Sequence, residues 1–559
     1  MIRNHSHWVV AYNYMTGEVR HDHSFSHRFA GDKVFVDNEE ELIIADGVVL
    51  NSPELKQNHN TDSVQGLYKH ILNGSLNPAE LFGPFTAFVY NKQDSKGMAF
   101  GNQTGDASVF YSLDEAKHEV VLSNNFNVLF YSTPPYMRCQ LDDDSAYQLL
   151  SHGFLCSDNT IVKGIKKLRA GMMLLLVKGE TPKVEVYHHF DFLTKTPMTM
   201  DDAIEGIDKR FRRAVKLCYD KDLEYGYTKH ITSISAGLDS RMVNLVAKDL
   251  GYTGIVNDCY SQTGSDEERY AFELEKYLGN QMYFRQLDDH SFIYDIENIC
   301  RLRFGMAYYI ADACKTQIDD ILDWDSLGLL HTGELGDHTV SGSYLTDKPF
   351  TWNPATGRNS SKLPIKDFEG DYSCDEDWSF YGRQFQFIVV TSYSASEWTY
   401  IVSPFLDPSF IQYCLTIPNS LRYGHRLYWA WIDKKYPEAG KIPSTRDRCD
   451  KAQTWNDMLQ LHWRGIKSRG RNMFYPFLHR LGLRDSSVSR NHMNPYDYWY
   501  ETNSETRNFI DNFFANHLYL LDNFPEIKTA CKKVFSGNAF DKLLAISLLA
   551  TIKVYSLND

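Results

Sequence analysis

The chain has 559 residues, which is too long for a single hydrophobic core and predicts two or three domains. Its net charge of −14 argues against a nucleic-acid-binding surface, and an aromatic content of 14% is typical of a folded protein. The sequence contains no run of about 18 apolar residues, so we expect no membrane span. The start has no apolar signal-peptide core and the ten cysteines form no Cys-x-x-Cys pair, so we expect a cytoplasmic protein.

The first third of the chain has the short, interrupted apolar runs that are typical of β-strands. Such runs occupy residues 8–12, 33–36, 41–44, 47–50, 85–90 and 108–111. Val64, Leu67 and Ile71 recur at helical spacing, so we expect a helix over residues 63–72. This part therefore predicts a domain built mainly of strands.

A strand, a loop and a helix near the middle of the chain carry the strongest functional signal. Residues 231–234 predict a strand, and the apolar residues between 242 and 250 fall at helical spacing. The loop between them reads Ser-Ala-Gly-Leu-Asp-Ser over 235–240. Small residues let backbone N–H groups close on an anion at a helix N-terminus, and the Asp239 carboxylate suits Mg²⁺. The alternative is a plain strand–helix connection in an α/β sheet.

This loop resembles the pyrophosphate-binding loop of ATP pyrophosphatases, Ser-Gly-Gly-x-Asp-Ser, with Ala236 in place of the first glycine. It differs from the kinase-type phosphate loop, because no Gly-Lys-Ser/Thr follows a Gly-rich run. The resemblance implies that the α-phosphorus of ATP is attacked and an adenylate forms. It also implies that ATP and its pyrophosphate are bound by Ser235, Ala236, Gly237, Leu238, Asp239 and Ser240.

Strand and helix signals continue to alternate after this loop, which predicts a parallel sheet with ligands at the carboxyl ends of its strands. Residues 253–260 predict a second strand, followed by a helix that ends at Gly279, and residues 327–332 predict a third strand. This region resembles synthetases of the asparagine type, in which the second strand end lies against the adenine, so Ser261 is an expected ATP contact. We interpret Asp266 and Glu267 as charges that favour a helix N-terminus.

The third strand runs into Gly333-Glu-Leu-Gly-Asp-His, which resembles the Gly-Glu-Gly-x-Asp-Glu of the same family. Two carboxylates on such a turn are costly unless something pairs with them. By resemblance, Asp337 binds Mg²⁺ opposite Asp239, Gly333 lies at the ATP, and Glu334 receives a proton from the attacking amine. The sequence departs from the family at Leu335 and at position 338, and the alternative is a turn of solvated charges.

The C-terminal third supplies a candidate cation. A helix is expected over 422–433, and the family places a catalytic lysine shortly after it. Lys441 fits best by position, and Lys451 is the alternative. Residues 403–407, Ser-Pro-Phe-Leu-Asp, resemble a supporting element of the family. Two segments near the C-terminus have apolar residues at helical spacing and predict a helical tail. The polar stretch 345–377 is expected to be either an ordered lid or a flexible insertion.

The first third also resembles the glutaminase domain of asparagine synthetases, through residues 46–51, 81–90 and 102–111. That family uses a cysteine directly after the initiator methionine as its nucleophile. Here Ile2 holds that position and the first cysteine is Cys139. Asn102 and Gln103 replace the family's Arg-Asp pair, so we expect a retained scaffold without glutaminase activity.

Together these features predict an α/β protein of two domains. Residues 1–195 are expected to form an Ntn-hydrolase-like αββα sandwich, joined by a linker over 189–197 to a parallel-sheet pyrophosphate-loop domain with a helical extension over 196–559. Asp201 and Asp202 are expected to cap the first helix of the second domain.

The resemblance implies an asparagine synthetase-like ligase that uses ATP and Mg²⁺ to join a small-molecule or peptide carboxylate to ammonia or an amine. One alternative is an intramolecular cyclase resembling β-lactam synthetases or lasso-peptide cyclases. Another is a catalytically silent scaffold. We expect neither nucleic acid nor membrane as a partner, and either a second copy or a protein of the same pathway could associate with the chain.

Overall fold

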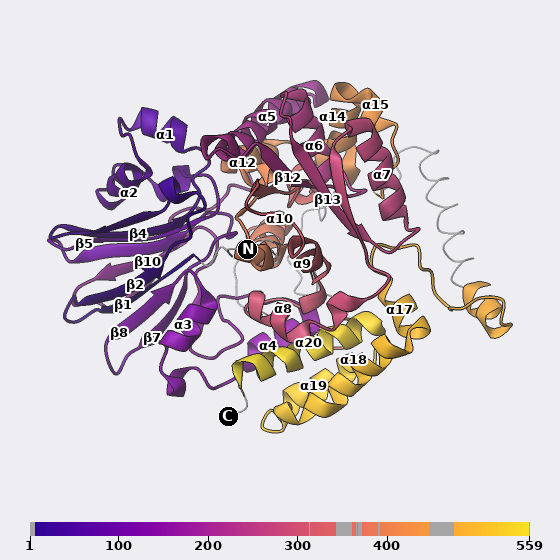
Figure 1. Ribbon diagram of the computed structural model, residues 1–559. Coiled ribbons are helices and arrows are strands. Elements are labelled where there is room, and N and C mark those ends of the chain that lie inside the picture. Colours follow the sequence, from indigo (N-terminus) through magenta and orange to yellow (C-terminus); the bar gives the residue numbers. More distant parts are fainter. Residues whose placement is uncertain are drawn as a thin grey trace.

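The computed structural model describes residues 6–311, 313–342, 360–364, 366, 372–388, 392–445 and 474–557. Figure 1 shows a sandwich of sheets in indigo and purple at the left, a second sheet with its helices at the upper right, and the last helices in yellow at the bottom. Most of the stretch expected as a lid lies outside the described residues, as do Ile2 and Lys451.

The sandwich stacks a five-stranded sheet on a six-stranded one, and the strand pairs of both are antiparallel. The first sheet has the order β2-β1-β8-β7-β9, with β1 at His7–Asn13, β2 at Val19–Ser24, β7 at Phe110–Asp114, β8 at Glu119–Ser123 and β9 at Ile165–Lys167. The second has the order β11-β10-β6-β5-β4-β3, with β3 at Val34–Asp37, β4 at Glu41–Gly47, β5 at Phe85–Asn91, β6 at Lys96–Gly101, β10 at Met172–Val177 and β11 at Lys183–Val186.

Apolar side chains fill the space between the two sheets, because successive side chains of a strand point to opposite faces. Trp8 and Val10 of β1 meet Leu42 and Ile44 of β4 in this core. The outer faces carry helices: α1 (Ser52–Asn58) and α2 (Val64–Leu72) on the six-stranded sheet, and α3 (Phe126–Ser132) on the five-stranded sheet. The sequence prediction of an αββα sandwich is confirmed.

One predicted strand of the sandwich is wrong. Gly47 ends β4, and residues 48–50 continue as irregular backbone. Val48 and Leu50 still donate to the carbonyls of Pro84 and Phe82, in register with β5, but neither bond is returned. Pro84 has no N–H, and the Phe82 N–H donates to Asn51 Oδ1, so the antiparallel ladder stops here.

The second part is built on a parallel sheet of order β14-β13-β12-β15-β16. Its strands are β12 (Lys229–Ser233), β13 (Ile255–Ser261), β14 (Gln281–Gln286), β15 (Leu327–His331) and β16 (Ile401–Val402). The three strands predicted from the sequence are β12, β13 and β15, and they lie side by side. The parallel sheet brings their carboxyl ends to one edge.

Helices cover both faces of this sheet. α5 (Met200–Glu224), α6 (Asp239–Asp249) and α7 (Asp266–Leu278) bury their apolar sides on one face, and α9 (Ala313–Asp319) lies against β13 and β14 on the other. The N-cap residue of α5 is Thr199, and of the predicted pair Asp201 and Asp202 it is Asp202 that takes part in the cap. Thr199 Oγ1 accepts from the Asp202 N–H while the Asp202 carboxylate accepts from the Thr199 N–H, a reciprocal capping box.

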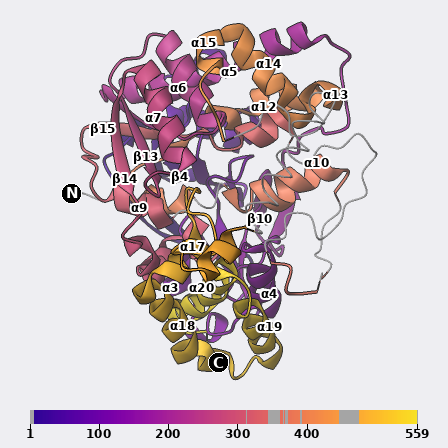
Figure 2. The ribbon, with the colours of Figure 1, turned by 90° about the vertical axis from the view of Figure 1, so that its right-hand side faces the viewer.

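The tail is helical, as predicted. α18 (Ser504–His517), α19 (Pro525–Phe535) and α20 (Ala539–Tyr555) form a layer with α4 (Asp143–His152) and α8 (Ile296–Leu302). Figure 2 shows this layer below the parallel sheet, with α5 and α14 (Arg426–Lys435) at the top. None of the helices in the described ranges combines the length and the apolar character needed to cross a membrane.

The fold class expected from the sequence is therefore confirmed. The connection between the two parts is packed rather than loose, because Phe190 and Phe192 are buried in the same core as Ala203 of α5. The boundary between residues 195 and 196 stays a prediction.

Candidate functional site

The loop between β12 and α6 is closed by its own hydrogen bonds. The Ser235 N–H donates to Ser240 Oγ at 3.0 Å, the two serine hydroxyls lie 2.8 Å apart, and the Gly237 N–H donates to Ser235 Oγ at 3.2 Å. These contacts hold the loop as a tight turn at the N-terminus of α6, where the helix dipole contributes partial positive charge. A tight turn at a helix N-terminus is a place where proteins can bind an anion.

The turn after β15 lies directly against this loop. β12 and β15 are neighbours in the sheet, so they deliver the loop and the turn to the same edge. A Cβ atom added to Gly333 would lie 2.5 Å from the Ser240 nitrogen, and one added to Gly336 would lie 2.7 Å from Asp239 Oδ1. Only glycine permits an approach this close, so these two positions bring the second motif onto the first.

Leu335 stands in this turn with a φ of 68° although it is not a glycine. The motif that this turn resembles in sequence has glycine at this position, and glycine adopts a positive φ without strain. The leucine side chain is buried in the core beneath the turn. Leu335 therefore keeps a left-handed backbone conformation although it is not a glycine. Packing of its side chain offsets the backbone strain.

Asp239 and Asp337 line one small cavity of about 260 Å³ together with Gly237 and Leu238. His425 Nε2 lies 2.5 Å from Asp337 Oδ1. Burial, together with the charges of Asp239 and Asp337, raises the pKa of Tyr428. Two carboxylates on facing loops are a donor set that fits Mg²⁺.

An adjoining cavity of about 310 Å³ opens at the carboxyl ends of β12, β13 and β15. It is lined by Ser235, Asp239, Ser240, Gly333 and Glu334, so the two cavities together are lined by most of the predicted site residues. The Glu334 carbonyl accepts from Ser403 Oγ at 2.9 Å, which ties the turn to the Ser-Pro-Phe-Leu-Asp element. Asp407 of that element caps α12 (Pro408–Thr416) and pairs with Arg213, in agreement with a supporting role.

The predicted cation lies elsewhere. Lys441 is 70% exposed and pairs with Glu438 at 2.6 Å, and it lines neither cavity. Lys451 lies outside the described residues, so its role stays a prediction. Among the described residues, Lys315 of α9 is the one lysine or arginine that lines the larger cavity. Its ammonium group lies 2.7 Å from Asp319 and 3.2 Å from Asp258, and nothing local in the sequence singled it out.

Two further predicted contacts are placed differently from the rest. Ser261 is fully buried, and its hydroxyl bonds to the Gln262 carbonyl and to Ser265 rather than facing either cavity. The Ala236 N–H donates to Glu267 Oε1 at 2.7 Å. Glu267 does lie in the first turn of α7, as predicted, but it also lines both cavities. Its contact with the loop was not foreseen.

The segment after α14 is fastened to the loop. The buried guanidinium of Arg241 donates to the carbonyls of Ala439, Ile442 and Pro443, at distances from 2.6 to 3.1 Å. The Ala236 carbonyl accepts from Ser444 Oγ at 2.7 Å. Residues 439–445 therefore lie beside the loop.

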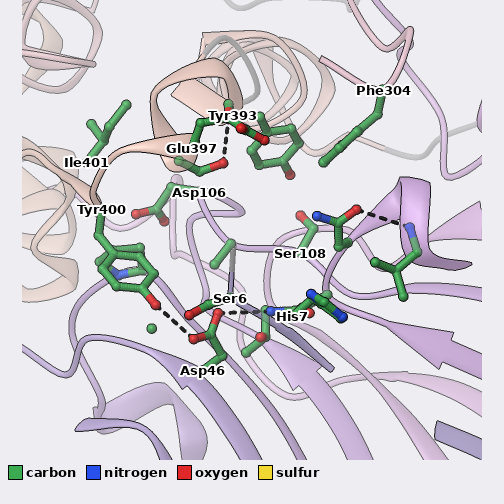
Figure 3. Close-up of a pocket in the computed structure, with 18 of the residues that line it drawn as sticks. Ser6, His7, Asp46, Asp106, Ser108, Phe304, Tyr393, Glu397, Tyr400 and Ile401 are labelled. Atoms are coloured by element: carbon green, nitrogen blue, oxygen red, sulfur yellow. Dashed lines mark hydrogen bonds between the residues drawn. The ribbon is translucent and has the colours of Figure 1, made fainter. Parts of the chain in front are cut away.

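A separate cavity of about 390 Å³ lies between the sandwich and the parallel-sheet part (Figure 3). Asp46 and Asp106 line it from the sandwich, and Glu397 and Tyr400 line it from the other side. Figure 3 shows the Tyr400 hydroxyl pointing at Asp46, and the two are 2.8 Å apart. Ile401 lines this cavity and also the 310 Å³ cavity, so the two are neighbours.

A buried trio on α5, β12 and β15 has the donor types of a metal site. His230 Nδ1 and His331 Nε2 lie 2.7 and 2.8 Å from the same oxygen of Asp222. Ligands of one tetrahedral Zn²⁺, each about 2.0–2.2 Å from the ion, would lie roughly 3.3 Å apart, so these are hydrogen bonds. The other Asp222 oxygen accepts from the Leu329 N–H at 2.7 Å. We assign the trio a structural role.

No family model matches the chain, and no curated protein matches it. Among solved structures, glutamine phosphoribosylpyrophosphate amidotransferase from B. subtilis complexed with ADP and GMP covers 50% of this chain and 84% of its own, with 10% identity and a TM-score of 0.23. The allosteric regulatory enzyme of purine biosynthesis covers 50% and 74%, with 9% identity and a TM-score of 0.22. Likeness at this level identifies neither fold nor function, and the fold class rests on the sheets themselves.

Proposed function

We propose that this chain is an ATP-dependent carbon–nitrogen ligase, similar to asparagine synthetases, that forms an amide through an acyl-adenylate. The proposal is carried by the contact between the 235–240 loop and the 333–337 turn. Gly333 and Gly336 bring an anion-binding loop, two facing carboxylates and Glu334 to one edge of a parallel sheet. This combination suits the activation of a carboxylate by ATP and the aminolysis that follows.

In the first half-reaction, the loop binds the β- and γ-phosphates while the substrate carboxylate attacks the α-phosphorus and pyrophosphate leaves. Asp239 and Asp337 would hold Mg²⁺, which supplies charge neutralisation for the pyrophosphate. A cation beside the α-phosphate would stabilise the transition state, a role predicted for Lys441 or Lys451. Lys315 is a further candidate, because it lines the larger cavity.

In the second half-reaction, ammonia or an amine attacks the acyl carbon and AMP leaves. The nitrogen becomes cationic as the C–N bond forms, and Glu334 accepts its proton. We propose that the nitrogen donor is free ammonia or an amine rather than glutamine, since such a glutaminase needs a thiol and the first cysteine of the sequence is Cys139. The same chemistry on one molecule that bears both groups would make a cyclase.

One observation favours a catalytically silent scaffold as the second candidate. A bound phosphate oxygen would accept a hydrogen bond from the Ala236 N–H. That N–H donates instead to the Glu267 carboxylate. If that contact were permanent, the loop would bind no nucleotide. The catalytic and silent proposals therefore differ in whether ATP enters the site at all.

Exchange of labelled pyrophosphate into ATP separates the two. The protein is incubated with Mg²⁺, ATP and a panel of carboxylic acids. The panel contains amino acids, N-acyl amino acids, dicarboxylic acids and peptides with a free carboxyl terminus. We expect exchange that depends on one class of acid, and loss of that exchange in Asp239→Asn. If calorimetry detects no ATP binding and no acid supports exchange, the silent scaffold is favoured.

A further inference from the structure

We propose that the Glu267 carboxylate is a built-in competitor for the phosphate site, which holds the Ala236 N–H until pyrophosphate or ATP displaces it. The inference rests on the proposed function, because it assumes that the loop binds phosphate. The Ala236–Glu267 hydrogen bond is then an autoinhibitory contact that lowers the affinity of the loop for a phosphate group.

The contact is specific in its geometry. Glu267 is the second residue of α7, whose N-terminus is capped by Ser265, and it reaches across from the end of β13 to the end of β12. Its Oε1 accepts from the Ala236 N–H at 2.7 Å, a short distance for a charge-assisted hydrogen bond. Ala236 itself is fully buried and its N–H points at Glu267, so another acceptor takes this N–H by displacing the Glu267 carboxylate.

The remaining donors explain why this one N–H matters. Of the backbone N–H groups of residues 235–237, those of Ser235 and Gly237 bond within the loop. The N–H of Ala236 bonds to a carboxylate from another element. Carboxylate and phosphate oxygens are both anionic acceptors of backbone N–H groups at helix N-termini. The Glu267 carboxylate therefore occupies the place of a phosphate oxygen.

Charge makes the competition stronger. Glu267 lines both cavities of the site, beside Asp239 in each, with Glu334 in one and Asp337 in the other. A phosphate group that approaches the loop meets these negative charges at short range, in a partly buried site where they are weakly screened. Moving Glu267 away removes a competitor and a repulsive charge in one step.

Three variants of the full chain separate the contact from the charge. Glu267→Gln removes the charge and keeps the shape, and Glu267→Asp keeps the charge but is one methylene too short for the contact. Glu268→Gln is the matched control, because Glu268 is the next residue of α7, bonds to the Gly264 N–H and lines neither cavity. Circular dichroism and thermal unfolding check that each variant is folded.

The probe is inorganic pyrophosphate, titrated by calorimetry once with excess EDTA and once with saturating Mg²⁺. We expect Glu267→Gln to bind pyrophosphate about tenfold more tightly than wild type in EDTA, the worth of one charge-assisted hydrogen bond. Glu267→Asp should fall between wild type and Glu267→Gln, and Glu268→Gln should match wild type.

Three results would overturn the inference, and they point to different causes. Equal affinity of wild type, Glu267→Asp and Glu267→Gln would show that the contact does not compete with phosphate. Weaker binding by Glu267→Gln only in the presence of Mg²⁺ would make Glu267 a metal ligand instead. Absence of pyrophosphate binding in wild type and all variants, with or without Mg²⁺, would refute the phosphate site and the proposed function with it.

Discussion

His425 Nε2 lies 2.5 Å from Asp337 Oδ1, and this contact orients the Asp337 carboxylate, which faces Asp239 across the candidate site. His425 comes from the kink between α13 (Asn419–Arg422) and α14, almost ninety positions along the chain from Asp337. Its backbone has a φ of 61°, so the chain is held in a left-handed turn where the imidazole reaches the carboxylate. The histidine is a positioning residue for a predicted metal ligand.

We therefore predict that His425→Asn weakens Mg²⁺ binding. Asparagine tolerates a positive φ, so the backbone can stay in place while the contact to Asp337 is lost. Partners of metal ligands are typically worth roughly 10- to 100-fold in metal affinity. Calorimetric titration of Mg²⁺ into the ATP-bound protein measures the loss.

His290→Asn is the control for this prediction. His290 has the same left-handed backbone, with a φ of 54°, but its side chain bonds to Thr506, away from the site. Equal Mg²⁺ affinity of His425→Asn and wild type would mean that Asp337 does not depend on this contact, or that it binds no metal.

A second prediction concerns the strain at Leu335. Replacing this residue by glycine or by alanine removes nearly the same buried side chain, but only glycine relieves the positive φ. We expect Leu335→Gly to be more stable than Leu335→Ala by about 1 kcal/mol in urea unfolding.

Leu329 of β15 provides the matched comparison for Leu335. It is also buried but lies in extended strand backbone, where glycine is the less favourable choice. Leu329→Ala should therefore be the more stable of its pair. If alanine proves better than glycine at both positions, Leu335 does not hold the strained conformation.

The third prediction is a pH dependence of stability. Burial lowers the pKa of His331 despite the neighbouring Asp222 charge, so the folded protein disfavours protonation of this ring. The unfolded chain takes up that proton at about pH 6.5, and stability from this group is lost as pH falls below that value. Burial tends to raise the Asp222 pKa, but His331 and His230 bring it below its usual value. Its contribution is present above about pH 3.8 and is lost below it.

Urea unfolding of wild type and His331→Gln at pH 7.5 and 5.5 tests this sign. The variant is expected to be less stable at both values, because the bond to Asp222 is altered. The informative quantity is the change between the two pH values, which should be smaller in the variant, by at most about 1.4 kcal/mol per pH unit for one proton. An unchanged difference would show that His331 does not account for the acid sensitivity.

The sequence predicted the fold class and the two motifs because these are local patterns. The 235–240 loop and the 333–337 turn each follow a strand, and a parallel sheet places the ends of neighbouring strands together. The contacts of Glu267, Lys315 and His425 could not be predicted in this way. Each comes from a distant element with no motif of its own, and the charge of Glu267 already had an explanation at a helix N-terminus.

The fourth prediction separates the two half-reactions through Glu334. Adenylation needs the phosphate loop and cationic charge but no proton acceptor, whereas aminolysis needs one. Glu334→Gln should therefore keep pyrophosphate exchange while amide formation falls by roughly 10²–10⁴-fold. Both rates are measured on the same preparation. An equal fall in exchange and amide formation would assign Glu334 a structural role.

The central claim is that a carboxylate attacks the α-phosphorus of ATP, and isotope transfer tests it most directly. The acid that supports exchange is labelled with ¹⁸O in its carboxylate and turned over with ATP and the amine. If an acyl-adenylate forms, one carboxylate oxygen stays on phosphorus when AMP leaves, so mass spectrometry should find ¹⁸O in AMP and none in inorganic phosphate. Label in inorganic phosphate, with ADP as the other product, would mean that the γ-phosphorus is attacked and would contradict the account.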